Sequence, residues 1–204
     1  MGFYSRVIFP RLCELALNQP FVAEQRRQLL AAARGEVLEI GFGTGLNLPH
    51  YPAAVGKLTI ADPNVGMHRL AQRRIERSPV AVERHVLGGE RLPFADATFD
   101  CVVSTFTLCS VAEANQTLRE AYRVLRPAGQ FLFLEHGLSP DPQVQVWQRR
   151  LNWLQMRVGD GCRLDRNIKA IVATQPFASI ESSEFYLEKG PKTHGYTYRG
   201  AATK

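Results

Sequence analysis

The chain lacks a long uncharged apolar run. Arg6, Arg11 and Glu14 interrupt the apolar residues near its start, whereas a helix that crosses a bilayer needs about 20 consecutive apolar residues. A secretory signal likewise needs an unbroken apolar stretch. We therefore expect neither a signal peptide nor a membrane span, and we expect the protein to be cytoplasmic.

Cysteine is scarce and widely spaced. No two cysteines stand in a Cys-x-x-Cys arrangement, which argues against a zinc ribbon and against a small disulfide-bonded scaffold. The spacing predicts no metal site, and the thiols are expected to be reduced, as is usual in the cytoplasm. The four residues are Cys13, Cys101, Cys109 and Cys162.

Acidic residues are somewhat fewer than basic ones. The chain has 25 Lys and Arg against 19 Asp and Glu, a formal net charge of +6. The arginines are spread along the chain and form no obvious basic cluster, so we expect no nucleic-acid partner. A moderate positive charge permits a peripheral contact with a membrane surface but does not specify one.

Internal repeats and linker-like stretches are also absent, and 204 residues is an ordinary length for one domain. Residues 1–34 have two helical patterns separated at Pro20. We expect this segment to be a helical lid on the pocket of the same domain, with a membrane-surface segment as the alternative. Residues 35–204 then form the main part of the domain.

Strand-like and helix-like patterns alternate through the rest of the chain. This alternation predicts an α/β fold with one Rossmann-like, seven-stranded, mostly parallel sheet and helices on both faces. A C-terminal antiparallel hairpin is expected to close the sheet, with its turn at Gly190-Pro191. One apolar helical stripe includes Trp147, which we expect to pack in the core. The predicted strands are 36–40, 57–61, 80–87, 99–103, 131–134, 178–186 and 196–201.

Three closely spaced glycines follow the first predicted strand. Gly41, Gly43 and Gly45 let the main chain approach a ligand, and Asp62 after the second strand can accept hydrogen bonds from both hydroxyls of a ribose. A dinucleotide fingerprint needs Gly-x-Gly-x-x-Gly to admit a pyrophosphate. Here the third glycine comes one position early, with Leu46 at the expected place, so the spacing favours S-adenosylmethionine over NAD.

The topology places several separate segments around one crevice. Ligands of such sheets bind at the carboxyl ends of the strands. That rule brings together residues 41–45, 62–63, 88–90, 104–109 and 135–136.

At this point the sequence resembles the class I S-adenosylmethionine-dependent methyltransferases. The glycine turn, Asp62, the Leu92-Pro93-Phe94 run and the segment 123–127 all fit that family. A narrower resemblance, to the methyltransferase-like protein 7 group of alkyl thiol S-methyltransferases and to related bacterial phospholipid or quinone methyltransferases, covers nearly the whole chain. It is carried by the segments 62–64, 107–111, 135–136, 147–148 and 159–162 and by Arg166.

The resemblance assigns a cofactor role to several of these residues. Glu39 is expected to hold the amino group of the methionine part, directly or through water, and Asp62 with Pro63 the ribose. Gly89 and Glu90 are expected near the adenine. The alternative for Glu90 is an exposed carboxylate on a loop. Ser104 and Thr105 should flank the methyl donor.

His136 is the best candidate for a general base. It follows the fifth predicted strand, and an imidazole can take a proton near neutral pH. The alternative is a histidine that only fixes a loop. Cys109 is a candidate for the acceptor side, although a buried free cysteine is more often a small apolar residue.

The resemblance implies methyl transfer to a small molecule, most plausibly a thiol. The alternatives are a phospholipid amine or a quinone carbon as acceptor, a nicotinamide oxidoreductase, and a catalytically silent cofactor-binding module. An arsenite methyltransferase is disfavoured because the spacing of the cysteines gives no clear site for a trivalent metalloid.

Overall fold

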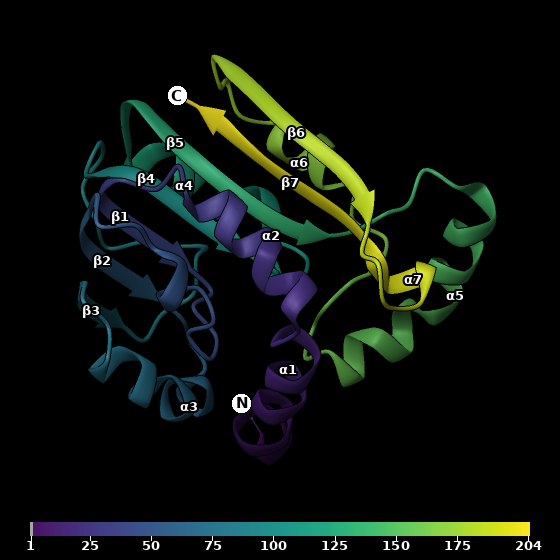
Figure 1. Ribbon diagram of the computed structural model, residues 1–204. Coiled ribbons are helices and arrows are strands. Elements are labelled where there is room, and N and C mark those ends of the chain that lie inside the picture. The colour runs from purple at the N-terminus through teal and green to yellow at the C-terminus, as the bar shows by residue number, and fades with distance from the viewer. Residues whose placement is uncertain (1) are drawn as a thin grey trace.

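The core of the protein is one seven-stranded sheet (Figure 1). The computed structural model describes residues 2–204. The strand order is β3-β2-β1-β4-β5-β7-β6. Strands β1 to β5 pair in parallel, and β7 runs antiparallel to both β5 and β6, so the predicted fold class and hairpin are confirmed. The strands are β1 Gly35–Ile40, β2 Val55–Ala61, β3 Ala81–His85, β4 Phe99–Thr105, β5 Leu125–His136, β6 Ser179–Tyr186 and β7 Tyr196–Thr203.

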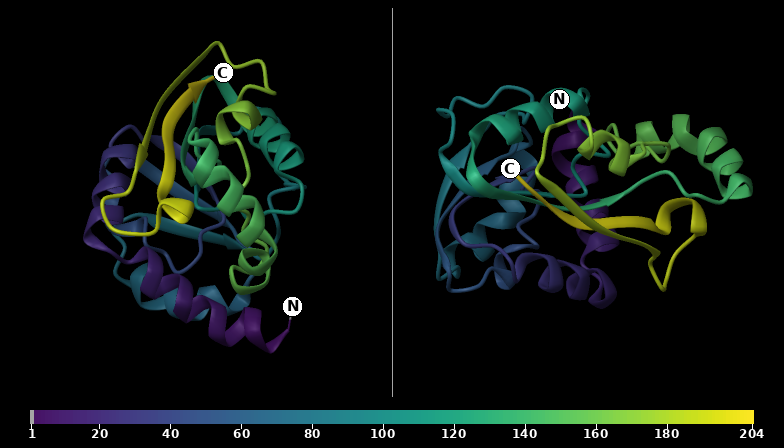
Figure 2. Two further views of the ribbon diagram at one scale, coloured as in Figure 1. Left: turned by 90° about the vertical axis from the view of Figure 1, so that its right-hand side faces the viewer. Right: turned by 90° about the horizontal axis from the view of Figure 1, so that it is seen from above.

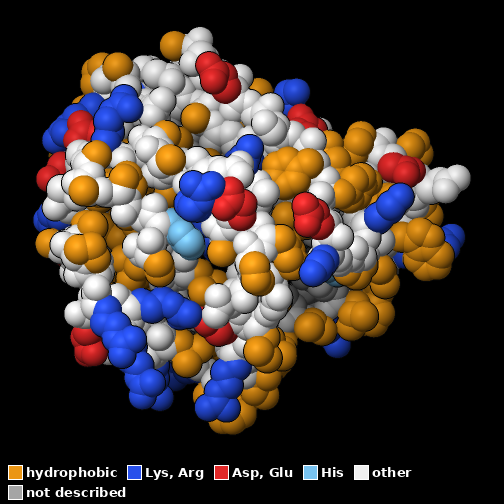
Figure 3. All heavy atoms as spheres, in the orientation of Figure 1, with side chains coloured by type: hydrophobic (Ala, Val, Ile, Leu, Met, Phe, Trp, Pro, Cys, Tyr) orange, Lys and Arg blue, Asp and Glu red, His pale blue; other side chains and the backbone are white. Residues whose placement is uncertain are grey.

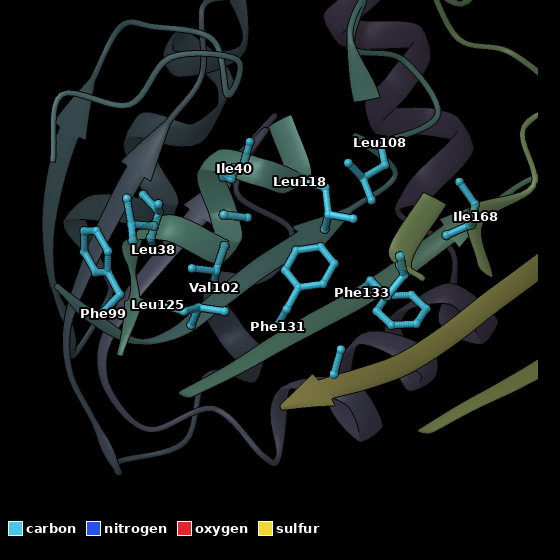
Figure 4. Packing of buried hydrophobic residues seen from close by; sticks show 14 of the residues in the cluster. Leu38, Ile40, Phe99, Val102, Leu108, Leu118, Leu125, Phe131, Phe133 and Ile168 are labelled. Atoms are coloured by element: carbon cyan, nitrogen blue, oxygen red, sulfur yellow. The ribbon is translucent and has the colours of Figure 1, made fainter. Parts of the chain in front are cut away.

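Helices cover both faces of the sheet, because alternate residues of the buried strands point to opposite sides. Leu38 of β1 and Phe131 of β5 pack with α4 and α6 (Figure 4). Val37 and Leu132 pack with α2 and α3 on the other face. The helices are η1 Tyr4–Ile8, α1 Phe9–Leu17, α2 Pro20–Leu30, η2 Leu48–His50, α3 Val65–Glu76, α4 Ala114–Val124, α5 Pro142–Val158, α6 Ile168–Val172 and α7 Lys192–Gly195.

Strand β5 is longer than the sequence predicted. It begins at Leu125 and includes Pro127 and Gly129, which the sequence placed in a turn. The pairing with β4 passes from Leu125 directly to Gln130, so the intervening residues form an irregularity inside the strand. A proline can be accommodated there because it lacks the N–H that a regular ladder needs.

The prediction that Trp147 of α5 packs in the core is wrong. Trp147 is 53% exposed and Trp153 is 64% exposed, and α5 stands out from the sheet (Figures 1 and 2). The buried face carries Val144, as the stripe predicted, together with Gln148 and Asn152. Gln148 bonds to the backbone of Ser139 and Gly137, and Asn152 accepts from Leu164 N–H, because buried loop backbone needs such partners.

The N-terminal helices are fixed to the body by polar contacts and by one close approach. Arg74 of α3 makes a salt bridge to Glu14 of α1 at 2.6 Å. The Ser5 hydroxyl donates to Asp160 at 2.7 Å. A Cβ at Gly66 would lie 2.0 Å from the carbonyl oxygen of Arg6, so glycine is needed where η1 crosses α3. The boundary at residue 34 and the role of residues 1–34 as a lid on the pocket stay predictions.

Apolar side chains lie on the surface at the α5 end of the molecule (Figure 3). Within residues 2–204, however, the helices are too short or too polar for any of them to cross a bilayer.

Candidate functional site

A first cavity of about 310 Å³ lies at the carboxyl ends of β1, β2 and β4, where the parallel topology predicts a ligand. The predicted residues that line it are Gly41, Gly43, Asp62, Pro63, Gly89, Glu90 and Thr105. Glu39, Gly45 and Ser104 lie behind this wall. The sequence analysis therefore gave the position of the cavity, but it did not show which of the predicted side chains reach the cavity.

The first two glycines of the turn serve different purposes. Both have positive φ, +73° at Gly41 and +57° at Gly43, a region that side chains rarely adopt. A Cβ at Gly41 would lie 2.0 Å from the hydroxyl of Thr107, so that glycine lets the β4 loop approach. A Cβ at Gly43 would meet no atom of residues 2–204 within 4 Å. Its main chain therefore faces the open cavity.

Asp62 holds this turn in place. Gly43 N–H donates to its Oδ2 and Asn64 N–H to its Oδ1, both at 2.7 Å. Burial raises the pKa of the carboxyl, and the two backbone donors oppose that shift. A carboxylate has about four acceptor positions, so two remain for a ligand in the cavity.

Glu39 belongs to a buried polar network behind the turn. Asn47 donates to one of its oxygens at 2.8 Å and Tyr51 to the other at 2.7 Å. Burial raises the pKa of Glu39 to about 7, although Tyr51 and the charge of Arg26 oppose the shift. Glu39 is buried and does not line the first cavity, and its role toward a cofactor stays a prediction.

Arg26 of α2 was missed by the sequence analysis. Its guanidinium donates to Asn47 at 2.7 Å and to Thr105 at 3.0 Å, lies over the Phe106 ring and lines the first cavity. Burial lowers its pKa, and the charge of Glu39 opposes the shift. The buried Nε atom has no partner among residues 2–204, and the guanidinium brings a positive charge to the wall of the cavity. Its place on an otherwise ordinary helix gave no sequence signal.

Glu135, at the end of β5, organises the loop after β4. It accepts from the Ser104 hydroxyl at 2.7 Å and from the N–H groups of Thr107, Leu108 and Cys109 at 3.0–3.3 Å. Ser104 is therefore a structural partner of Glu135 in this protein. Burial raises the pKa of Glu135, and these four donors oppose the shift.

A second cavity of about 380 Å³ adjoins the first. The two share a wall of five residues, and the second contains both predicted residues of the acceptor side, His136 and Cys109. Its remaining walls come mainly from α1, the end of α5 and the segment before α7. The shared residues are Phe9, Cys13, Leu17, Phe106 and Ser110.

His136 and Cys109 meet a third residue, Cys162, in the wall of this cavity. His136 Nε2 lies 2.8 Å from Cys162 Sγ, and the two sulfurs are 3.8 Å apart. The Cys109 thiol and the neighbouring imidazole lower the pKa of Cys162. Burial alone would lower the pKa of His136, but the charge of Cys162 raises it. The wide sequence spacing gave no sign of this cluster.

The first cavity suits a nucleoside that carries an amino-acid tail. Asp62 retains free acceptor positions, the Gly43 main chain is open, and Arg26 brings a positive charge to the wall. Residues 38–133 match the family described as "Methyltransferase domain". The chain belongs to the S-adenosylmethionine-dependent methyltransferases, and its cofactor is S-adenosylmethionine.

Two relatives of the chain carry names that give different acceptors. The chain is 36% identical to thiol S-methyltransferase TMT1B of Rattus norvegicus over 149 residues, which are 71% of this chain and 61% of the relative. It is 37% identical to the ubiquinone/menaquinone biosynthesis C-methyltransferase UbiE of Escherichia coli over 108 residues, 50% of this chain and 43% of that one. The chain thus spans less than two thirds of either relative.

A solved structure of similar fold covers nearly the whole chain. A SAM-dependent methyltransferase from Thermotoga maritima superposes with a TM-score of 0.70 at 18% identity and covers 98% of each chain. At that identity the likeness concerns the fold alone.

Proposed function

We propose that the protein transfers the methyl group of S-adenosylmethionine to a small thiol. The observation that carries this proposal is the apolar second cavity, which adjoins the cofactor cavity and has the Cys109–His136–Cys162 cluster in its wall. The similarity to thiol S-methyltransferase TMT1B over 71% of the chain supports the same acceptor.

Three regions of the first cavity would hold the cofactor. Asp62 accepts from the ribose hydroxyls, and Gly89 and Glu90 line the place for the adenine. Arg26 provides a buried positive charge for the carboxylate of the methionine part, since a charged donor binds a carboxylate strongly. When bound, the cofactor supplies a methyl group already activated on a sulfonium.

The protein's remaining tasks are to place the acceptor and to remove its proton. Orientation alone can contribute several kcal/mol. A thiol must be deprotonated first, because the thiolate is the nucleophile. The Cys109–His136–Cys162 cluster lies in the wall of the second cavity and can meet this requirement.

A membrane-bound acceptor is the second candidate. The exposed Trp147 and Trp153 of α5 lie near Arg149, Arg150 and Arg157 on the same helix. Aromatic rings among basic residues are typical of helices that lie at an anionic membrane surface. This arrangement favours a peripheral contact, through which a lipid amine or a quinone would reach the second cavity. The cytoplasmic location stays a prediction.

Methyl transfer from radiolabelled cofactor tests the proposal. Small alkyl thiols, phospholipid vesicles and a reduced quinone are offered in parallel, and the product is extracted and identified. We expect labelled thioether. Labelled lipid or quinone in the presence of unlabelled thiol would overturn the thiol assignment. Binding of S-adenosylhomocysteine without turnover of any acceptor would indicate a silent module, and binding of NAD in its place an oxidoreductase.

A further inference from the structure

Cys109, His136 and Cys162 converge from three separate parts of the fold. Cys109 lies in the loop after β4, His136 ends β5, and Cys162 follows α5. All three are more than nine-tenths buried. Among residues 2–204 they form the one group of at least three potential metal ligands whose donor atoms all lie within 4.8 Å of one another.

The spacing of these donor atoms suits a tetrahedral ion. Two thiolates on tetrahedral zinc, each about 2.3 Å from the metal, are about 3.8 Å apart, and the two sulfurs here are 3.8 Å apart. The imidazole nitrogen would have to move from 2.8 Å to about 3.6 Å from Cys162 Sγ. A small displacement of the His136 ring, which lines the second cavity, would provide that distance.

A second observation also points to a missing ligand. The Nδ1 atom of the buried His136 ring has no hydrogen-bond partner among residues 2–204. Buried polar atoms are rarely left unpaired in native proteins. An ion on Nε2, the nitrogen that lies against Cys162 Sγ, would fix the ring, and Nδ1 could then donate its proton to a water or a ligand.

The backbone around the cluster is held in place before any ion binds. Glu135 accepts from Cys109 N–H, and Arg163 N–H donates to the Cys109 carbonyl at 2.9 Å. Arg166 donates to the carbonyls of Leu108 and Val111, so the loop that carries Cys162 is tied to the loop that carries Cys109. Such second contacts orient metal ligands and strengthen binding.

We propose that Cys109, His136 and Cys162 bind one thiophilic divalent cation, with zinc as the best fit, and leave its fourth coordination position open to the second cavity. Two thiolates and one imidazole form a soft ligand set that selects zinc over magnesium or calcium. Two thiolates also cancel the charge of the ion, which suits an apolar cavity.

The open position deepens the proposed function and rests on it. Zinc sites with three protein ligands and a free position are catalytic in type. An acceptor thiol that binds there loses its proton to solvent and becomes a thiolate, because a metal-bound thiol is deprotonated. His136 and Cys109 then act as ligands, in place of the base and acceptor-side roles that the sequence predicted.

Cobalt(II) binding to the full chain tests the site. The protein is stripped of metal with a chelator under reducing conditions and titrated with Co²⁺, whose thiolate charge-transfer absorption reports sulfur ligands. We expect one ion per chain, displaced by Zn²⁺. Cys109→Ser and Cys162→Ser should each weaken binding at least about 100-fold, whereas the matched control Cys101→Ala, a buried cysteine outside the cluster, should bind as the parent does.

Unchanged affinity for S-adenosylhomocysteine shows that each variant is folded. No uptake of Co²⁺, or uptake that survives both serine variants, overturns the metal site. A change of the cobalt spectrum on addition of an alkyl thiol supports the open position. Equal thiol methylation by metal-free and zinc-loaded protein overturns the open position but leaves the proposed function intact. Metal binding without methylation of any thiol overturns the proposed function and leaves the site.

Discussion

Replacement of Asp62 by asparagine should weaken the binding of S-adenosylhomocysteine. The carboxylate is buried, lines the first cavity, and uses two of its acceptor positions for the N–H groups of Gly43 and Asn64. The other two positions are the ones expected to accept the ribose hydroxyls. Asparagine has nearly the same shape but retains one oxygen and adds a donor, so it cannot accept from both hydroxyls while it holds both backbone groups.

The expected loss follows from one charge-assisted hydrogen bond. Such a bond contributes about 1.5–3 kcal/mol, which corresponds to a roughly 10- to 150-fold increase in Kd. Calorimetric titration with S-adenosylhomocysteine at pH 7 measures it. Asp160→Asn is a matched control, because Asp160 also lines this cavity but is bonded to Ser5; its Kd should change less than about threefold.

Thermal unfolding separates a loss of binding from a loss of structure, since the Asp62→Asn variant also loses part of an internal bond. A variant that unfolds at the parent's temperature and binds S-adenosylhomocysteine within threefold of the parent would show that Asp62 does not hold the ribose. The cofactor assignment of the first cavity would then be wrong.

Three further perturbations test the surroundings of the site. Gly66→Ala forces a methyl group against the Arg6 carbonyl and should destabilise the protein by about 1–3 kcal/mol, with faster hydrogen exchange in residues 4–17. Burial raises the pKa of Glu39 from 4.5 to about 7, so between these pH values the folded state holds a proton that the unfolded state has lost. The parent should therefore lose stability relative to Glu39→Gln as the pH rises from about 4.5 to 7. A difference in unfolding free energy that stays constant over this range would contradict the prediction. Trp147→Ser with Trp153→Ser should reduce binding to anionic vesicles at least about fivefold in a sedimentation assay, and an unchanged bound fraction would count against the membrane contact.

The sheet and the cofactor cavity could be predicted because both depend on local patterns. Buried parallel strands are unbroken apolar runs, and these runs are recognisable without knowledge of their neighbours. The glycine turn and Asp62 follow two such runs directly, so parallel pairing alone brings them together. Observed β1 begins one residue before its predicted start, and observed β2 two residues before.

The face of α5 could not be predicted in the same way. Periodicity shows that a helix has an apolar stripe, but it does not show what the stripe meets. In this protein the loops at 137–139 and at 164 need hydrogen-bond partners, and Gln148 and Asn152 provide them from the face that they share with Val144. Trp147 and Trp153 are therefore left at the surface.

The difference between local patterns and long-range packing also explains why the acceptor was harder to infer than the cofactor. Residues 38–133, which match the methyltransferase family, provide most of the first cavity but only Phe106, Cys109 and Ser110 of the second. The other walls come from residues 9–22 and 136–195. In the proposed function the choice of acceptor is therefore encoded mainly outside the shared domain, in segments that meet only after β5, α5 and the N-terminal helices have packed. A change of acceptor among related proteins should accordingly follow substitutions in those two segments and leave the glycine turn and Asp62 as they are.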